Sequence, residues 1–165
     1  MTNWRQFFDD LRARVGETVA VTNWRSYDQD SENQFARLTD EWDPMHNDPA
    51  WAAKSPWGGT IVHGFHVLCH VHSDLREYVG LPLMTNDEVW ALNYGLDRVR
   101  FISPLRVGQR ARTQIVLERI DERRPGEFLV RTVHTVEAEG TEKPFMVAEV
   151  LTLFQFRDTL ASGTG

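Results

Sequence analysis

The sequence predicts an α+β domain in which a curved antiparallel sheet packs against one central helix. In the second half of the chain, long segments alternate apolar and polar residues, the pattern of half-buried strands. Ahead of them, residues 64–78 repeat apolar residues at helical spacing. The 165 residues are enough for one domain with a full core and too few for two of ordinary size.

The chain begins with a predicted amphipathic helix at residues 1–16. The apolar residues that share its inner face are Trp4, Phe7, Phe8, Leu11 and Val15. Gly16 follows, and glycine is common at the ends of helices. A β-rich segment at 17–25 then predicts a strand. We expect residues 17–157 to form a single domain and residues 158–165 to form a disordered tail.

Short helices and loops are predicted before the central helix. Asp30 or Ser31 is a suitable N-terminal cap for a helix at 32–38. Asp48 and Pro49 have the residue types favoured at the cap and at the first position of another short helix.

The central helix is predicted at residues 64–78. Its apolar stripe comprises Gly64, Leu68, Val71, Leu75 and Val79. Its opposite stripe comprises His66, His70, Ser73 and Glu77. Gly80 and Pro82 follow directly and are expected to end the helix.

The remaining strands are predicted after residue 88. They span residues 89–102, 109–122, 127–140 and 145–156. The connections between them are short and contain glycine or proline. Because short connections join strands that are neighbours in space, we expect an antiparallel meander in which each strand pairs with the next.

Charge and cysteine content exclude several classes of protein. The net charge is −6 and no long basic block is present, which argues against a nucleic-acid partner. The single cysteine, Cys69, permits no internal disulfide and fits a reducing compartment. No apolar run has the length of a membrane span, and the N-terminal segment has no apolar core of signal-peptide length. We therefore expect a cytoplasmic protein without a membrane partner.

Residues 35–64 contain the densest group of titratable side chains in the chain. Glu41 and His46 lie close together in sequence, and a carboxylate beside an imidazole is a common acid–base pair. His63 and Gly64 follow where the central helix is predicted to start. Backbone N–H groups at a helix start can stabilise a developing negative charge.

The same stretch resembles a known family. Its main segment reads FARLTDEWDPMH from Phe35 to His46, and NDP, SPWGGTI, HG, NYGL, VRF, SPL and VG follow downstream. These motifs are similar to those of the MaoC-like acyl dehydratases and R-specific enoyl-CoA hydratases, especially the branch related to nodulation protein N. The likeness extends from Val15 to Phe156, and the combination of motifs is specific although each alone is weak.

The resemblance implies a hot-dog fold, in which the sheet wraps around the central helix, and usually a homodimer. It implies the reversible hydration of a trans-2-enoyl thioester that is carried by coenzyme A or by an acyl carrier protein. It implies no metal ion and no redox cofactor. The residues that match the catalytic positions of the family are Glu41, His46 and Gly64.

One catalytic position departs from the family pattern. Glu41 stands where the family has aspartate, and its neighbour Asp40 stands where the family has glycine. The glutamate arm is longer by one methylene, and a displacement of about 1 Å at a reacting group can cost on the order of a hundredfold in rate. Three alternatives stay open: the backbone compensates, Asp40 or Asp43 takes over the role, or activity is reduced or lost.

We expect Glu41 and His46 to activate water together while the N–H of Gly64 stabilises the oxyanion. The residues expected to contact the substrate are Asp43, Pro44, His63, Asn93 and Tyr94. For Asp43 a structural role in the turn is an alternative, and for His63 a packing role is one.

Two further clusters have weaker interpretations. His66 and His70 have the i, i+4 spacing of a zinc-binding pair, but no HExxH motif accompanies them, so we expect no metal site. An arginine cluster either contacts coenzyme A phosphates or lies on a solvated strand face. Its members are Arg98, Arg100, Arg106, Arg110 and Arg112.

Two other functions are compatible with the sequence. A hot-dog acyl-CoA thioesterase would use a similar acyl pocket but direct water at the thioester carbonyl. A non-catalytic thioester-binding protein would need the pocket alone, and the replacement at Glu41 is consistent with it.

Overall fold

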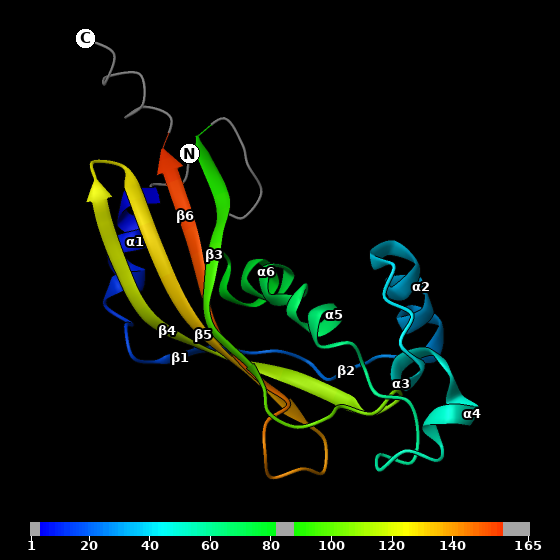
Figure 1. Ribbon diagram of the computed structural model, residues 1–165. Helices are drawn as coiled ribbons and strands as arrows, with labels where there is room; N and C mark the ends of the chain where they lie inside the picture. The colour runs from blue at the N-terminus through cyan, green and yellow to red at the C-terminus, as the bar shows by residue number, and fades with distance from the viewer. Residues whose placement is uncertain (1–3, 82–87, 157–165) are drawn as a thin grey trace.

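The computed structural model describes residues 4–81 and 88–156 (Figure 1). The helices are α1 (Trp4–Arg12), α2 (Gln29–Thr39), α3 (Pro44–Asn47), α4 (Pro49–Ala52), α5 (Gly64–Leu68), α6 (Val71–Asp74) and the π-helix η1 (Leu75–Val79). The strands are β1 (Thr18–Val21), β2 (Arg25–Ser26), β3 (Val89–Phe101), β4 (Arg110–Arg124), β5 (Glu127–Ala138) and β6 (Met146–Phe156). The tail expected at 158–165 lies outside the described residues.

The four long strands lie where their alternation predicts them, but they do not form a simple meander. The antiparallel sheet has the order β1-β4-β5-β6-β3, and β2 pairs with β4 beside β1. Strands β4, β5 and β6 are consecutive neighbours, as expected. Strand β3 pairs with β6 instead of with β4, so the meander predicted for all four strands is wrong.

The connection from β3 to β4 explains this order. Residues 102–109 run beside the segment that precedes the central helix: the Val62 N–H donates to the Leu105 carbonyl, and the Val107 N–H donates to the Thr60 carbonyl. An isolated bridge between Ile61 and Arg106 completes the contact. Because this connection pairs with residues 60–62, it leads the chain across the domain to the far side of the sheet.

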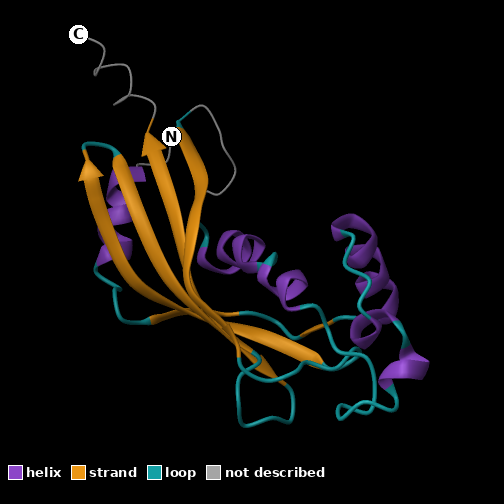
Figure 2. Ribbon diagram, in the orientation of Figure 1, coloured by secondary structure: helices purple, strands orange, loops and turns teal. Residues whose placement is uncertain are grey.

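The sheet curves around the central helical region, as expected (Figures 1 and 2). Val71 and Leu75 from the predicted apolar stripe are buried in one core cluster with strand residues such as Ile115 and Val136. The predicted single helix at 64–78 is broken into α5, α6 and η1, which is a correction. At the first break, the His70 N–H donates only three residues back, to Val67, and the Ser73 hydroxyl donates to the His70 carbonyl.

Helix α1 closes one end of the core. Phe8 is fully buried and stacks on Phe128 with 4.9 Å between the ring centroids. Side-chain alternation along β5 places Phe128 on the same sheet face as Thr132 and His134. The aromatic face of the N-terminal helix therefore packs against the domain. Within the part of the chain that the structure describes, no helix is long and apolar enough to cross a membrane.

Two polar groups are fully buried between the central helix and the sheet. The Asp74 carboxylate accepts from the Arg25 guanidinium at 3.1 Å and from the Thr113 hydroxyl at 3.2 Å. His134 is completely buried, and this burial, with a smaller contribution from the charge of His72, lowers its pKa to about 3. The contacts of Asp74 tie the central helix to β2 and β4.

The second helix begins earlier than predicted. Asp28 is its N-cap, and its carboxylate accepts from the Ser31 N–H at 2.8 Å, so the expected caps Asp30 and Ser31 lie inside the helix. The cap predicted at Asp48, with Pro49 in the first turn of α4, is confirmed. Helices α2, α3 and α4 lie beyond α5, at the right in Figure 1.

Candidate active site

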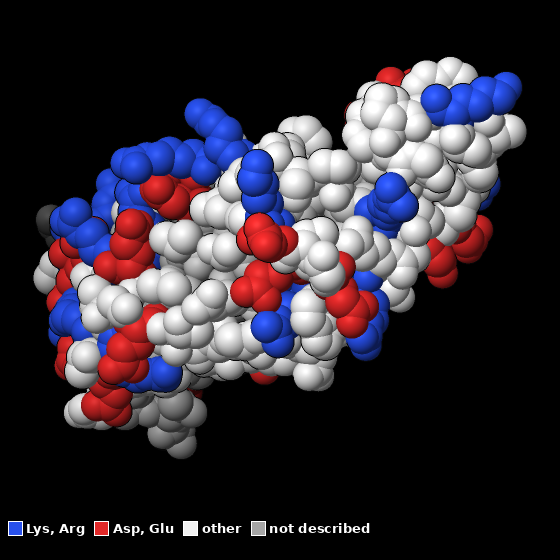
Figure 3. Space-filling view, turned by 90° about the horizontal axis from the view of Figure 1, so that it is seen from below, with Lys and Arg blue, Asp and Glu red and all other residues white. Residues whose placement is uncertain are grey.

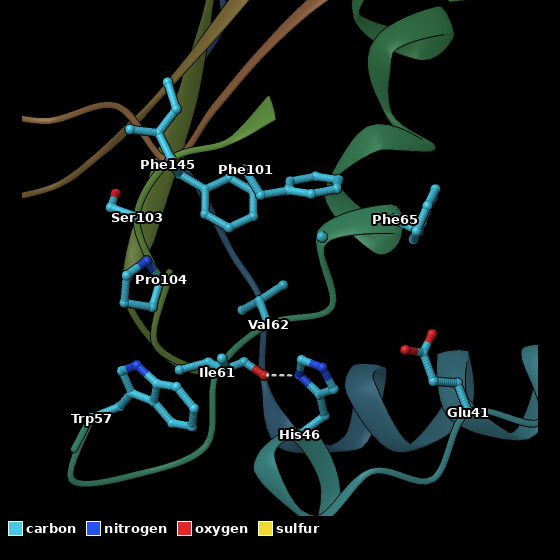
Figure 4. A pocket seen from close by; sticks show the side chains of 12 residues that line it. Glu41, His46, Trp57, Ile61, Val62, Phe65, Phe101, Ser103, Pro104 and Phe145 are labelled. Carbon is cyan, nitrogen blue, oxygen red and sulfur yellow. Dashed lines mark hydrogen bonds between the residues drawn. The ribbon is translucent and has the colours of Figure 1, made fainter. Parts of the chain in front are cut away.

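A cavity of about 400 Å³ lies where α3, α5 and the end of β3 approach one another (Figure 4). It is lined by Glu41, His46, Trp57, Ile61, Val62, Gly64, Phe65, Phe101, Ile102, Ser103, Pro104 and Phe145. Most of these side chains are apolar, and the only titratable ones are Glu41 and His46. The cavity is therefore lined together by the three residues that the sequence led us to expect as catalytic: Glu41, His46 and Gly64.

His46 is positioned by the short helix α3. Asp43 caps this helix by accepting the Met45 N–H at 2.9 Å, and Pro44 occupies its first turn. The buried His46 ring lies with Nδ1 2.7 Å from the Ile61 carbonyl oxygen. A carbonyl only accepts, so Nδ1 carries the proton and the neutral ring has its unprotonated nitrogen at Nε2. That nitrogen can act as a base.

Glu41 is the one acidic residue of its segment that lines the cavity. The preceding residue, Asp40, ends α2 with a left-handed φ of 59°, a conformation that glycine adopts most easily. The Glu41 N–H donates to the Ala36 carbonyl, which fixes the backbone just after this turn. Asp40 is not among the lining residues, and the Asp43 carboxylate is occupied as a helix cap.

Gly64 starts α5 at the wall of the cavity. A Cβ atom at this position would lie 2.7 Å from the Phe101 ring, so any larger residue would displace that ring. No described residue accepts a hydrogen bond from the Gly64 N–H, since the first helix turn leaves it unpaired. This N–H is a free donor at the cavity wall.

The sequence analysis missed a buried carboxylate behind these residues. Glu32 of α2 is completely buried and lies 2.6 Å from His63 Nδ1 and 2.7 Å from His66 Nδ1. Burial raises its pKa, but the hydrogen bonds from His66 and His63 outweigh this and hold the pKa below its usual value. The available signal was spacing, because Glu32 shares a helix face with Phe35 and Ala36.

Several expected substrate contacts lie elsewhere in the single chain. His63 is buried and stacks on His46 behind the cavity wall, with ring centroids 3.9 Å apart, and it is not among the lining residues. Asn93 and Tyr94 lie in the first half of β3, whereas Phe101 ends it. With a rise of about 3.3 Å per strand residue, more than about 20 Å separates them from the Phe101 end.

The arginine cluster is mostly paired with carboxylates on the sheet. Arg98 pairs with Glu149, Arg110 with Glu139 and Arg112 with Glu137. On the face shown in Figure 3, basic and acidic side chains lie next to one another. These contacts favour a solvated strand face for those three arginines. Among the residues that the structure describes, no group of three or more His, Cys, Asp and Glu is arranged to hold a metal ion.

The chain is similar to several known proteins. Residues 10–138 match the family model described as MaoC like domain. Nodulation protein N of Rhizobium leguminosarum bv. viciae is 35% identical over 148 residues, which cover 89% of this chain and 90% of that protein. The 3-hydroxyacyl-thioester dehydratase Z of Mycobacterium tuberculosis (strain ATCC 25618 / H37Rv) is 36% identical over 143 residues, or 85% of this chain and 90% of that protein.

The fold is shared with solved structures at lower identity. The (R)-hydratase from A. caviae involved in PHA biosynthesis matches with a TM-score of 0.68 and 18% identity, covering 82% of this chain and 95% of that chain. A MaoC-like dehydratase from Rhodospirillum rubrum matches with a TM-score of 0.68 and 20% identity, covering 87% of this chain and 93% of that chain. The expected hot-dog fold is confirmed.

Proposed function

The chain belongs to the MaoC-like domain family, and on this premise we propose that it catalyses the reversible hydration of a 2-enoyl thioester to a 3-hydroxyacyl thioester. The observation that carries the proposal is the cavity that Glu41, His46 and Gly64 line together. A carboxylate, an imidazole and a free backbone N–H are the groups that this reaction needs. The relative named 3-hydroxyacyl-thioester dehydratase supports the same reaction class.

The geometry suggests how the atoms move. A water molecule held between Glu41 and His46 loses one proton to this pair as its oxygen bonds to the β-carbon of the enoyl chain. Negative charge then develops on the thioester oxygen, where the Gly64 N–H stabilises it. The pair returns one proton to the α-carbon, and the reverse sequence expels water.

Glu41 supplies the carboxylate in this proposal. Of the three acidic residues that could replace the family aspartate, it is the one that lines the cavity, whereas Asp43 already caps α3. The turn at Asp40 and the hydrogen bond of the Glu41 N–H to Ala36 support compensation by the backbone for the longer arm. The apolar side chains of Val62, Phe101 and others in the cavity suit an acyl chain, carried by coenzyme A or an acyl carrier protein.

A panel of trans-2-enoyl-CoA esters tests the function, with loss of enoyl absorbance as the readout and the configuration of the 3-hydroxy product determined. We expect Glu41→Gln and His46→Ala to lower kcat by about 10²- to 10⁴-fold, the range for a lost general acid or base. Asp48→Asn is the matched control, because it removes a nearby exposed carboxylate while asparagine still caps α4. Near-full activity of either site variant would remove that residue from the mechanism.

The same panel separates the rival functions. Release of free thiol from added saturated acyl-CoA esters, together with no loss of enoyl absorbance from the trans-2-enoyl-CoA panel, would favour a thioesterase. Binding of the esters without turnover at any chain length would favour a non-catalytic binding protein. Cytoplasmic location stays a prediction.

The edge strand β3 supports a homodimer. Among the residues that the structure describes, its ladder partner is β6, and it exposes the large apolar side chains of Leu92, Tyr94 and Leu96. An unpaired edge with apolar side chains is a surface that a second copy can cover by continuing the sheet. Sedimentation as a dimer is expected for the wild type, and Leu92→Lys should shift it toward monomer. A monomeric wild type would contradict this arrangement.

A further inference from the structure

Glu32 and His63 form a buried pair directly behind His46. The Glu32 carboxylate and the His63 side chain are 0% and 1% exposed. Glu32 Oε2 accepts from both the backbone N–H of His63, at 2.8 Å, and its ring Nδ1, at 2.6 Å. Glu32 Oε1 accepts from His66 Nδ1 at 2.7 Å. Three donors around one carboxylate stabilise its ionised form in the core.

The second ring nitrogen of His63 also faces an acceptor. His63 Nε2 lies 3.3 Å from the backbone oxygen of Glu41. An ionised carboxylate and a carbonyl can only accept, so both contacts are hydrogen bonds only if both ring nitrogens carry a proton. His66 differs, because no described residue offers an acceptor to its Nε2. A neutral His66 with its proton on Nδ1 already makes the hydrogen bond with Glu32. Of the two rings that contact Glu32, His63 is therefore the one that has an acceptor at each ring nitrogen.

His46 is the next ring in this arrangement. It stacks on His63 with an interplanar angle of 26° and donates from Nδ1 to Ile61. The titratable groups next to this pair of rings are Glu32 of α2, which also contacts His66 of α5, and Glu41 on the cavity side. An imidazolium stacked on His46 opposes a second positive charge there, because like charges repel at this separation.

We propose that Glu32 is a positioning residue that holds His63 as an imidazolium against His46 and thereby keeps Nε2 of His46 unprotonated. Glu32 does not itself line the cavity. It acts through His63, whose contact with the backbone of Glu41 also fixes the place of that carboxylate arm. This assignment rests on the proposed function for its effect on catalysis, but the charge of His63 can be measured without any substrate.

The first measurement is ¹⁵N NMR of the histidine rings near neutral pH in the full-length wild type, with His63 assigned by its loss in His63→Gln. We expect His63 to show two protonated ring nitrogens and His46 to show one. In Glu32→Gln the His63 ring should become neutral. A neutral His63 in the wild type would overturn the proposal whether or not the protein turns over an enoyl thioester.

The second measurement is the pH dependence of kcat/KM. In Glu32→Gln we expect kcat to fall at least tenfold with KM within twofold. We also expect the acid limb of the profile to move to higher pH, because the positive charge that the proposal places on His63 beside His46 is then lost. Asp74→Asn is the matched control, since Asp74 is an equally buried carboxylate bonded to Arg25 and Thr113 and outside the cavity. Its kcat and acid limb should be unchanged.

The conservative variant Glu32→Asp controls for misfolding of Glu32→Gln. Glu32→Asp keeps the charge and should retain a charged His63 and an acid limb closer to the wild type than that of Glu32→Gln. An unchanged acid limb in a folded Glu32→Gln, or the same shift in Asp74→Asn, would overturn the positioning role. If the wild type hydrates no enoyl thioester, the proposed function fails, and the NMR result still decides the state of His63.

Discussion

Glu32 and Asp74 are both buried carboxylates that fix the central helical region, but their partners differ. Asp74 pairs with Arg25, whose guanidinium is charged at every relevant pH, and with the Thr113 hydroxyl. Glu32 pairs with imidazoles, whose charge depends on their surroundings. A buried carboxylate that pairs with a permanently charged guanidinium anchors a helix to a sheet. To the carboxylate that pairs with titratable imidazoles we assign the positioning of a catalytic histidine.

A third buried group, His134, should make the largest contribution to the pH dependence of folding stability. The pKa of His134 is lowered to about 3 by burial, whereas an unfolded histidine has a pKa of 6.5. As the pH falls from 6.5 toward 3, the unfolded chain therefore binds a proton that the folded chain does not. Stability should fall with a slope of about 1.4 kcal/mol per pH unit, to a total of about 5 kcal/mol.

Urea unfolding at a series of pH values checks this prediction. The His134→Leu variant should lose less stability than the wild type between pH 6.5 and the onset of acid unfolding. If the free energies of unfolding of the two proteins fell equally with pH, another group would be responsible for the acid sensitivity.

Asp74→Asn tests how much the contacts of Asp74 with Arg25 and Thr113 stabilise the fold. Removing one partner of a buried ion pair typically costs 3–5 kcal/mol, and we expect about 3 kcal/mol because Arg25 is partly exposed and keeps contact with water. Chemical denaturation at pH 7 measures the loss, and kcat per folded molecule should be unaffected. Lost kcat with unchanged stability would give Asp74 the role that we assign to Glu32.

At neutral pH, Glu32→Gln should lower the free energy of unfolding by about 2 kcal/mol. This is less than the loss expected for Asp74→Asn, because the amide retains part of the hydrogen bonding. The folded pKa of Glu32 lies below its usual value of 4.5. Its stabilising contribution is therefore complete above pH 4.5 and is lost as the pH falls through the folded pKa. We compare the single variant His134→Leu with the double variant His134→Leu/Glu32→Gln by urea unfolding. The difference between their free energies of unfolding should become smaller below pH 4.5. A difference that does not change with pH would contradict the predicted pH dependence.

The smallest expected effect is an increase in stability on the substitution Asp40→Gly. Asp40 adopts a left-handed φ of 59°, so Asp40→Gly should stabilise the protein by about 0.5 kcal/mol through relief of backbone strain. Activity should be retained, because the turn that presents Glu41 keeps its conformation. Denaturant midpoints measure the gain, and a loss of stability would show that the Asp40 side chain makes a stabilising contact.

Features set by local chemistry could be predicted from the sequence. The alternation along β4 and β5 and the cap at Asp48 depend on neighbouring residues only, so their patterns located them correctly. Glu41, His46 and Gly64 were found through the family motif, and the structure brings them to one cavity. Their catalytic roles stay predictions.

Features set by distant contacts could not be predicted. The pairing of β3 with β6 depends on how residues 102–109 pack against 60–62, which no local pattern encodes. Glu32 was missed for a related reason. A charged residue on an inner helix face is buried only when partners such as His63, which is 31 positions away in sequence, arrive to neutralise it.

The contact of Phe101 with Gly64 links the assembly of the protein to its chemistry. Phe101 ends β3, the strand that we assign to the dimer contact, and its ring lies against Gly64, which lines the cavity. Dilution that separates the subunits would free this strand edge and loosen the ring at the reaction centre. Under the proposed function, specific activity should therefore fall when the protein is diluted below the concentration at which it dimerises.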